Sequence, residues 1–364
     1  MIILCHGTGD CGNSTELENG TLTKTELWIP WAQKIFIRND VPVLVVPGLY
    51  SSSPAAFIAE TRRFLADVGR HIRPQARATA VVGGDALFAE LSNAGTMKEV
   101  SNAIEAFGRH LTLVQISLLA VRLLEGRAGY GNGRWGGTAY FKGSAKGIKV
   151  RMAVAGLCAY AYLKWDTRAN NSLRCRIVGH SRGGTTAMGI HNLISRMTVD
   201  GAAPVLDRTL LLDPIHGKVK VSARHLYYTT VWAGTVVDQP VAPAQRKGDF
   251  FGINWVFNRV EVQARGGNIH VQQPLQNTKH GHMGKLCRVD GERRAPPRQQ
   301  QYDSMRLALD AHVALIRHDT LANQIDSLLD VDVARVCANH SGMKTHDTGD
   351  ARLLFASIVN ALVR

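Results

Sequence analysis

One serine lies between two glycines at the junction of an apolar run and a helical pattern. Residues 174–194 read RCRIVGHSRGGTTAMGIHNLI, and Gly179, Ser181 and Gly183 in this stretch satisfy the spacing G-x-S-x-G. A serine in this context lies on a sharp strand-to-helix turn, and its small neighbours avoid collisions with adjacent strands. The turn directs the hydroxyl toward the amides of a helix N-terminus, which can stabilise an oxyanion. The spacing therefore predicts a nucleophile at Ser181; the alternative is a tight turn made of small residues.

A serine nucleophile needs a base, and in hydrolases with this turn the base is a histidine late in the chain. His280 and His282 flank a glycine in NTKHGHMGKL, after the last expected strand. Either histidine could accept the serine proton, and their spacing alone does not separate them. The alternative for both is a surface loop that contains histidines by chance.

The base in turn needs an acid that orients it, and two aspartates are candidates. Asp213 ends the apolar run of LLLDPIHG, and Asp238 follows the next run in VWAGTVVDQPVAP. The acid usually follows one strand farther along the chain than Asp213, which favours Asp238. Asp213 stays a candidate, and its alternative role is to accept backbone amides in the turn made by Pro214.

The first apolar run ends in CHGTGD, a glycine turn expected at the same sheet edge as the serine. The amides of Gly7 or Thr8, together with that of Arg182, would form an oxyanion hole. The turn lacks the Lys-Ser/Thr of a P-loop and the full G-x-G-x-x-G spacing, so no nucleotide cofactor is expected. Six cysteines without C-x-x-C spacing predict neither a zinc site nor any other metal site.

The expected strands are short runs without clean apolar and polar alternation, as in strands buried on both faces of a parallel sheet. They lie at 2–4, 41–46, 173–178, 208–213, 225–232 and 268–275. Helical patterns at 54–70 and 145–165 lie between some of them. This alternation predicts an α/β fold with a mainly parallel central sheet flanked by helices.

Two segments depart from the alternation of strands and helices. Residues 76–128 have mostly helical patterns and are long for one crossover, which predicts an insertion or cap over the functional edge of the sheet. Residues 291–301 read GERRAPPRQQQ, typical of a linker, and amphipathic segments follow. The expected domains are therefore 1–290, containing the sheet, and 291–364, a linker with a helical C-terminal tail.

The chain has 364 residues with 43 Lys+Arg against 29 Asp+Glu, a formal charge of +14. This excess favours anionic partners such as lipid headgroups or an acidic protein. Nucleic acid is not favoured, because no basic stripe with interleaved aromatic residues is present. The N-terminus has no signal-peptide pattern and the apolar run 111–124 is too short and too polar to span a bilayer, so the chain is expected in the cytoplasm of the producing cell.

Five blocks, LCHGTGD, VVPGL, VGHSRGG, LLLDPI and HGHMG, follow one another in an order that resembles bacterial α/β-hydrolases related to the type VI secretion lipase effectors. The resemblance spans residues 1 to about 290. It implies an α/β-hydrolase fold, with Ser181 as the nucleophile and Gly7 and Thr8 in the oxyanion turn. The late histidine loop falls on residues 279–281, which favours His280, although Lys279 departs from the asparagine of that loop.

The resemblance also implies a lipase or phospholipase that cleaves carboxylic esters of membrane lipids and needs no cofactor. Delivery by a secretion system, with an immunity or delivery protein as partner, would follow from it, and the positive charge would attract the protein to an anionic bilayer. The same fold hosts many reactions. A serine hydrolase of a soluble ester, thioester or amide, and a binding module with an inactive serine turn, are the alternatives.

Overall fold

The structure of the chain is a computed structural model that describes the following residues. They are 1–7, 26, 28–48, 54–72, 84–94, 97–125, 145–169, 174–199, 201, 205–214, 219–220, 227–232, 262–263, 269–274, 306, 309–310, 357–359 and 361–362.

A six-stranded parallel sheet forms the centre of the molecule, with strand order β2-β1-β3-β4-β6-β8. Its strands are β1 (Ile2–Cys5), β2 (Val43–Val46), β3 (Arg174–His180), β4 (Val205–Leu212), β6 (Tyr227–Trp232) and β8 (Ile269–Pro274). Each of the six runs expected to be a strand overlaps one of them. A separate short pair consists of β5 (Val219–Lys220) and β7 (Val262–Gln263). The predicted α/β class, with a parallel sheet flanked by helices, is therefore confirmed.

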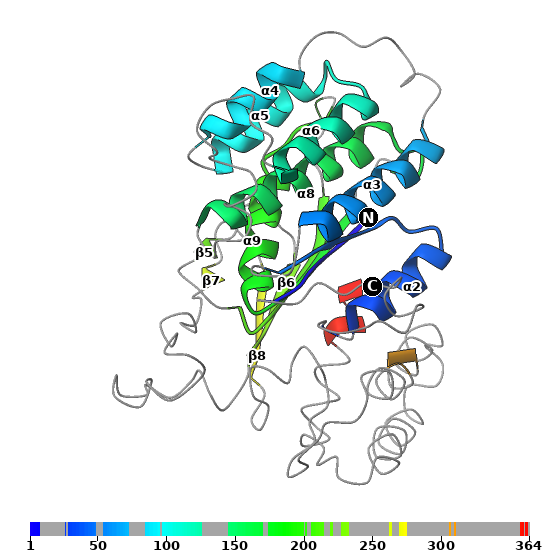
Figure 1. Cartoon of the computed structure of the whole chain (residues 1–364). Coiled ribbons are helices and arrows are strands. Elements are labelled where there is room, and N and C mark those ends of the chain that lie inside the picture. Colours follow the sequence, from blue (N-terminus) through cyan, green and yellow to red (C-terminus); the bar gives the residue numbers. More distant parts are fainter. Residues whose placement is uncertain are drawn as a thin grey trace.

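Helices α3 (Pro54–Arg70), α8 (Ala145–Trp165) and α9 (Arg182–Ile194) cover one face of the sheet (Figure 1). Alternate strand residues, such as Ile3, Leu44 and Ile177, point into the core that these helices share. Alternation follows from the two-residue period of a strand. The helical patterns at 54–70 and 145–165 coincide with α3 and α8.

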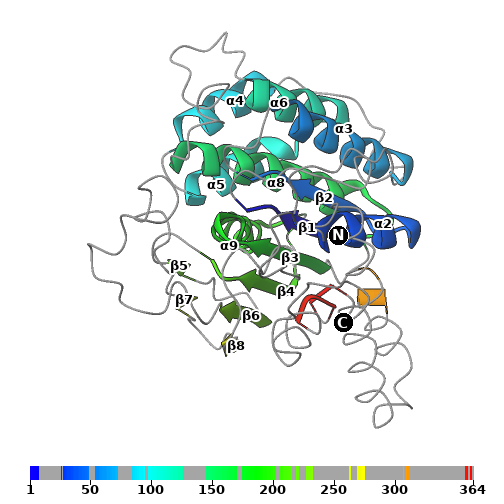
Figure 2. The same ribbon diagram turned by 60° about the horizontal axis from the view of Figure 1, so that its bottom comes forward.

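Three further helices lie outside this layer: α4 (Gly84–Asn93), α5 (Met97–Gly108) and α6 (Leu113–Glu125). α6 packs on α3 and α8, α5 packs on α8 and α9, and α4 packs on α5 and α6 (Figures 1 and 2). Where the segment 76–128 is described, it is mainly helical, and a role for it as a cap over the functional edge stays a prediction. None of the helices in the described ranges combines the length and apolarity that crossing a bilayer requires.

The opposite face of the sheet packs against α2 (Trp28–Arg38), whose Trp28, Ile29 and Trp31 are buried (Figures 1 and 2). Residues from the end of the chain lie on the same face. Trp31 Nε1 donates a hydrogen bond to Asp310 Oδ1 at 2.9 Å, and Arg176 of β3 donates to the carbonyl oxygen of Leu362. The parts of 291–364 that are described thus contact the sheet domain directly, while the expected linker at 291–301 lies outside the described residues.

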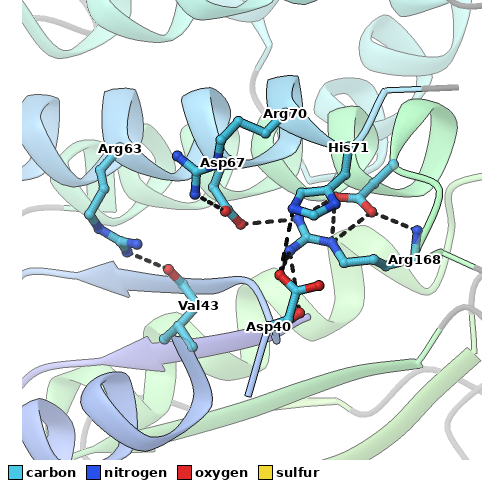
Figure 3. A network of polar contacts seen from close by, with 8 residues as sticks. Asp40, Val43, Arg63, Asp67, Arg70, His71 and Arg168 are labelled. Atoms are coloured by element: carbon cyan, nitrogen blue, oxygen red, sulfur yellow. Dashed lines mark hydrogen bonds and ion pairs between the residues drawn. The ribbon is translucent and has the colours of Figure 1, made fainter. Parts of the chain in front are cut away.

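Ion pairs centred on Arg168 tie together the chain at the edge of the sheet where the strands begin (Figure 3). Its guanidinium contacts Asp40, which precedes β2, at 2.8 Å, Asp67 of α3 at 3.0 Å and Asp166 at 2.6 Å. Partial burial opposes the charge of Arg168, but the hydrogen bonds and charges of Asp166 and Asp67 outweigh it and raise the pKa of Arg168. The edge where the strands begin is therefore fixed by charge pairing.

Candidate functional site

Ser181 connects β3 to α9 with an unusual backbone conformation, φ 57° and ψ −127°. These angles match the first central position of a type II′ turn, where glycine is favoured because a Cβ atom is crowded there. A residue other than glycine in such a conformation costs about 1–3 kcal/mol. The turn is held in place because the amide of Ser181 donates to Leu212 O at 2.9 Å and its carbonyl accepts from Gly184 N at 3.0 Å.

The glycines of the serine turn are required by close backbone contacts. A Cβ atom on Gly179 would lie 2.3 Å from the carbonyl oxygen of Gly183. A Cβ atom on Gly183 would lie 2.4 Å from the carbonyl oxygens of both Cys5 and His6. The strand-to-helix turn therefore fits directly against the end of β1, as the G-x-S-x-G spacing predicts.

The turn that follows β1 lies beside Ser181. A Cβ atom built on Gly7 would be 3.2 Å from the Cβ atom of Ser181, so Gly7 lies close to the side chain of the serine and leaves no room for a larger residue. The amide of Gly7 donates a hydrogen bond to Glu26 Oε1 at 2.7 Å. Of the two amides expected from this turn in an oxyanion hole, that of Gly7 is therefore directed at a carboxylate, and Thr8 lies outside the described residues.

Glu26 connects three groups around the serine turn. Its Oε1 accepts from Gly7 N and lies 3.0 Å from His180 Nδ1, and its Oε2 contacts His6 Nδ1. The side chain of Glu26 is 1% exposed. Burial opposes its charge, but the charge and hydrogen bonds of His6 and His180 outweigh burial and lower the pKa of Glu26 below its ordinary value. Because an ionised carboxylate only accepts hydrogen bonds, each facing Nδ1 carries the hydrogen.

Two other residues expected in the site are described by the structure. Arg182 is the first residue of α9, so its amide belongs to the positive end of the helix. Asp213 follows β4, is fully buried and has φ 40°. It is the neighbour of Leu212, which accepts the Ser181 amide, so Asp213 lies next to the serine turn.

Three candidates for the acid and the base, Asp238, His280 and His282, lie outside the described residues. The strands before them are described: β6 ends at Trp232 and β8 ends at Pro274. Since all strands of the sheet are parallel, β6 and β8 end at the same edge as β3. Trp232 and Pro274 therefore lie at the edge of the sheet where Ser181 follows β3.

Sequence reasoning missed two buried charged residues at this edge, Glu26 and Arg151. Arg151 of α8 is 1% exposed and donates to the carbonyl oxygens of Pro47 at 2.7 Å and Gly48 at 2.8 Å. It thereby holds the chain just after β2. The sequence signal that could have found them is their position, because each is a charged residue inside or beside an apolar stretch. Charged residues are rarely buried without partners, so such a position indicates buried polar contacts.

The described ranges contain buried cysteines but no cluster of metal ligands. Cys5, Cys158 and Cys175 are buried free thiols, and burial raises the pKa of each. No group of histidine, cysteine, aspartate and glutamate side chains in the described part of the chain is arranged to hold a metal ion.

Comparison of the chain with known family profiles, curated proteins and solved structures finds no match.

Proposed function

We propose that the protein is a serine hydrolase of carboxylic esters with Ser181 as its nucleophile. The observation that carries the proposal is the backbone of Ser181, a serine held at φ 57° and ψ −127° directly before the first residue of α9. Glycine would avoid the strain there, so a serine at this position indicates a use for its hydroxyl. The amide end of α9 provides the positive potential that a developing oxyanion needs.

The strand order gives independent support and fits an α/β-hydrolase fold. β1 and β4 flank β3, so the glycine turn after β1 and the segment after β4 both lie beside the serine. β6 and β8 follow on one side in the order β4-β6-β8. The expected nucleophile, acid and base thus follow three different strands of the sheet, in the chain order serine, aspartate, histidine.

In the proposed reaction the Ser181 hydroxyl attacks the ester carbonyl while His280 or His282 accepts its proton. Asp238, or alternatively Asp213, orients the imidazole, and the amides of Thr8 and Arg182 stabilise the oxyanion. The alcohol leaves with the proton returned by the histidine, giving an acyl-serine. Water then attacks the acyl group with the same histidine as base, which releases the acid and restores Ser181.

We propose that the substrate is a phospholipid and that the protein is an α/β-hydrolase of the lipase type, which acts at an anionic bilayer. The formal charge of +14 supports this choice because basic proteins concentrate at anionic lipid surfaces. Delivery to another cell and an immunity partner belong to the same proposal and depend on the resemblance to secretion effectors. A soluble ester, thioester or amide is the alternative substrate class.

Labelling with a fluorophosphonate probe tests the nucleophile. The wild-type protein should become labelled on Ser181, and Ser181→Ala should lose the label. Ser195→Ala is a matched control, because Ser195 is also a buried serine, at the C-terminal end of α9, and its hydroxyl donates to Asn192 O at 3.1 Å. A folded wild-type protein that takes no label, or takes it equally in Ser181→Ala, would refute the proposal.

The same assay separates the candidates for acid and base. Asp213→Asn and Asp238→Asn are compared for labelling rate, and His280→Ala and His282→Ala likewise. Loss of a triad member should reduce the rate by roughly a factor of 10⁴ or more. For the substrate class, release of fatty acid from anionic liposomes is compared with hydrolysis of p-nitrophenyl esters of increasing chain length; preference for short soluble esters would exclude the lipase.

A further inference from the structure

Glu26 lies where the two sides of the proposed oxyanion hole meet. One side is the glycine turn after β1, and the other is the turn between β3 and α9. A single oxygen of Glu26, Oε1, accepts from Gly7 N on the first side at 2.7 Å and is 3.0 Å from His180 Nδ1 on the second. His180 is the residue immediately before Ser181.

The other oxygen of Glu26 fixes the first side a second time, through its contact with His6 Nδ1. His6 and Gly7 are consecutive, so the peptide between them is held at both residues. The next peptide in the chain, between Gly7 and Thr8, carries the amide expected to bind the oxyanion. The bonds that Glu26 accepts from His6 and Gly7 thus hold the residues from which the chain enters that peptide.

Glu26 itself is fixed by its position at the start of α2. Its carbonyl oxygen accepts from Ile29 N at 3.0 Å in the first turn of that helix, and α2 packs on the sheet through buried side chains. Three segments, the turn after β1, the serine turn and the start of α2, thus meet at one carboxylate that is buried from solvent. Hydrogen bonds to a charged acceptor are about twice as strong as neutral ones, so this junction is rigid.

We propose that Glu26 is a positioning residue of the hydrolase, which holds the oxyanion turn at a fixed distance from Ser181 through His6, Gly7 and His180. This inference depends on the proposed function. Glu26 does not touch the reacting atoms in this role. Its contribution is that the oxyanion donors are already in place before the transition state forms, which is where such donors have their effect.

The variants Glu26→Gln and Glu26→Ala test the proposal, with Glu60→Gln as the matched control. Glu60 is a buried glutamate of α3, 4% exposed, that accepts from Gln33 Nε2 at 2.9 Å and lies outside the candidate site. Glutamine keeps the shape of Glu26 and one acceptor oxygen but removes the charge. It is therefore expected to fold even if the alanine variant, which strands several buried polar groups, does not.

Hydrogen exchange followed by mass spectrometry measures how tightly the backbone at the junction is held, and it does not depend on enzymatic activity. Peptides covering residues 1–7 and 176–184 should exchange about tenfold faster in Glu26→Gln than in the wild type. In Glu60→Gln the exchange rate of the same peptides should equal that of the wild type. Unchanged exchange of these peptides in Glu26→Gln would overturn the inference, whether or not the protein is a hydrolase. If the wild type takes no fluorophosphonate label, the proposed function is refuted. The exchange rates still show whether Glu26 holds the two turns together.

Labelling rate and ester hydrolysis then measure the effect on the reaction. Misplaced donors should reduce kcat and the labelling rate about tenfold in Glu26→Gln and about a hundredfold in Glu26→Ala, with KM within about threefold of wild type. Wild-type rates in both folded variants would overturn the positioning role. A loss in Glu26→Gln as complete as in Ser181→Ala would also overturn it, because Glu26 would then be the triad acid.

Discussion

Substitution of Ser181 by glycine should make the protein more stable than substitution by alanine. Both variants remove the hydroxyl, so both should lose the fluorophosphonate label. They differ in the backbone, because alanine keeps a Cβ atom at φ 57° and ψ −127° while glycine does not. Glycine is the residue that tolerates this region without strain.

The size of the difference follows from two opposing terms. Removing the strain contributes about 1–3 kcal/mol, and the greater freedom of glycine in the unfolded chain costs about 0.5–1 kcal/mol. Taken at the middle of the two ranges, the free energy of unfolding of Ser181→Gly should therefore exceed that of Ser181→Ala by about 1 kcal/mol. At about 2 °C per kcal/mol for a chain of this size, the expected difference in Tm is roughly 2 °C.

Scanning calorimetry of the two variants in one buffer measures this difference, with Ser195 as the control position. Ser195 has helical angles, φ −63° and ψ −16°, where glycine has no conformational advantage. Ser195→Gly should accordingly be less stable than Ser195→Ala by up to about 1 kcal/mol. A Tm of Ser181→Gly equal to or below that of Ser181→Ala would refute the claim of backbone strain, and with it the main support for Ser181 as a nucleophile.

Three further measurements test other parts of the structure. Gly183→Ala should lower the free energy of unfolding by about 3 kcal/mol or more, because its Cβ atom would lie 2.4 Å from two backbone oxygens. The control Gly69→Ala, whose Cβ atom would lie 3.4 Å from a leucine methyl group, should change it by less than about 1 kcal/mol. Urea unfolding measures both. Arg168→Met should lower the free energy of unfolding by about 3 kcal/mol, because it leaves the buried carboxylate of Asp166 without its ion pair. Asp40→Asn removes an exposed partner of Arg168 and should lower it by less than about 1 kcal/mol. Equal losses would contradict the role assigned to burial. Because the folded-state pKa of Glu26 is below its ordinary value of 4.5, the stabilisation from its charge is full above about pH 4.5 and falls as the pH drops toward the folded pKa. The Tm advantage of wild type over Glu26→Gln should therefore narrow from pH 5 to pH 3, and a constant advantage would contradict the assigned charge.

The sheet could be predicted from the sequence because its strands are short apolar runs separated by clear turns. β1 and β2 are buried at every residue, so their patterns are continuous and apolar and indicate a parallel sheet before any pairing is known. Helix α2 was not predicted. Its apolar residues, which include Trp28 and Trp31, follow one another too closely to give a clean one-sided pattern, and it became recognisable only against the sheet.

The serine turn was equally accessible, because steric demands on Gly179 and Gly183 leave a trace in the sequence itself. The contacts of Glu26 with His6 and His180 correspond to no comparable pattern in the sequence. Glu26 is distant in sequence from His6 and His180, and the three meet only because β1 and β3 are neighbours in the sheet and α2 begins beside their ends. Chemical contacts between segments brought together by the topology have no fixed spacing that a single sequence can reveal.

The contact between Arg176 and the carbonyl of Leu362 has a consequence for how the chain folds during its synthesis. Ile358, Val359 and Leu362 are buried, on the face of the sheet that β3 shares with α2. At roughly 5–20 residues per second, about 10–40 s pass between the synthesis of the nucleophile strand and that of residue 362. During that interval the positions that Ile358, Val359 and Leu362 occupy are vacant, so this face of the sheet is completely covered only after these residues have been made.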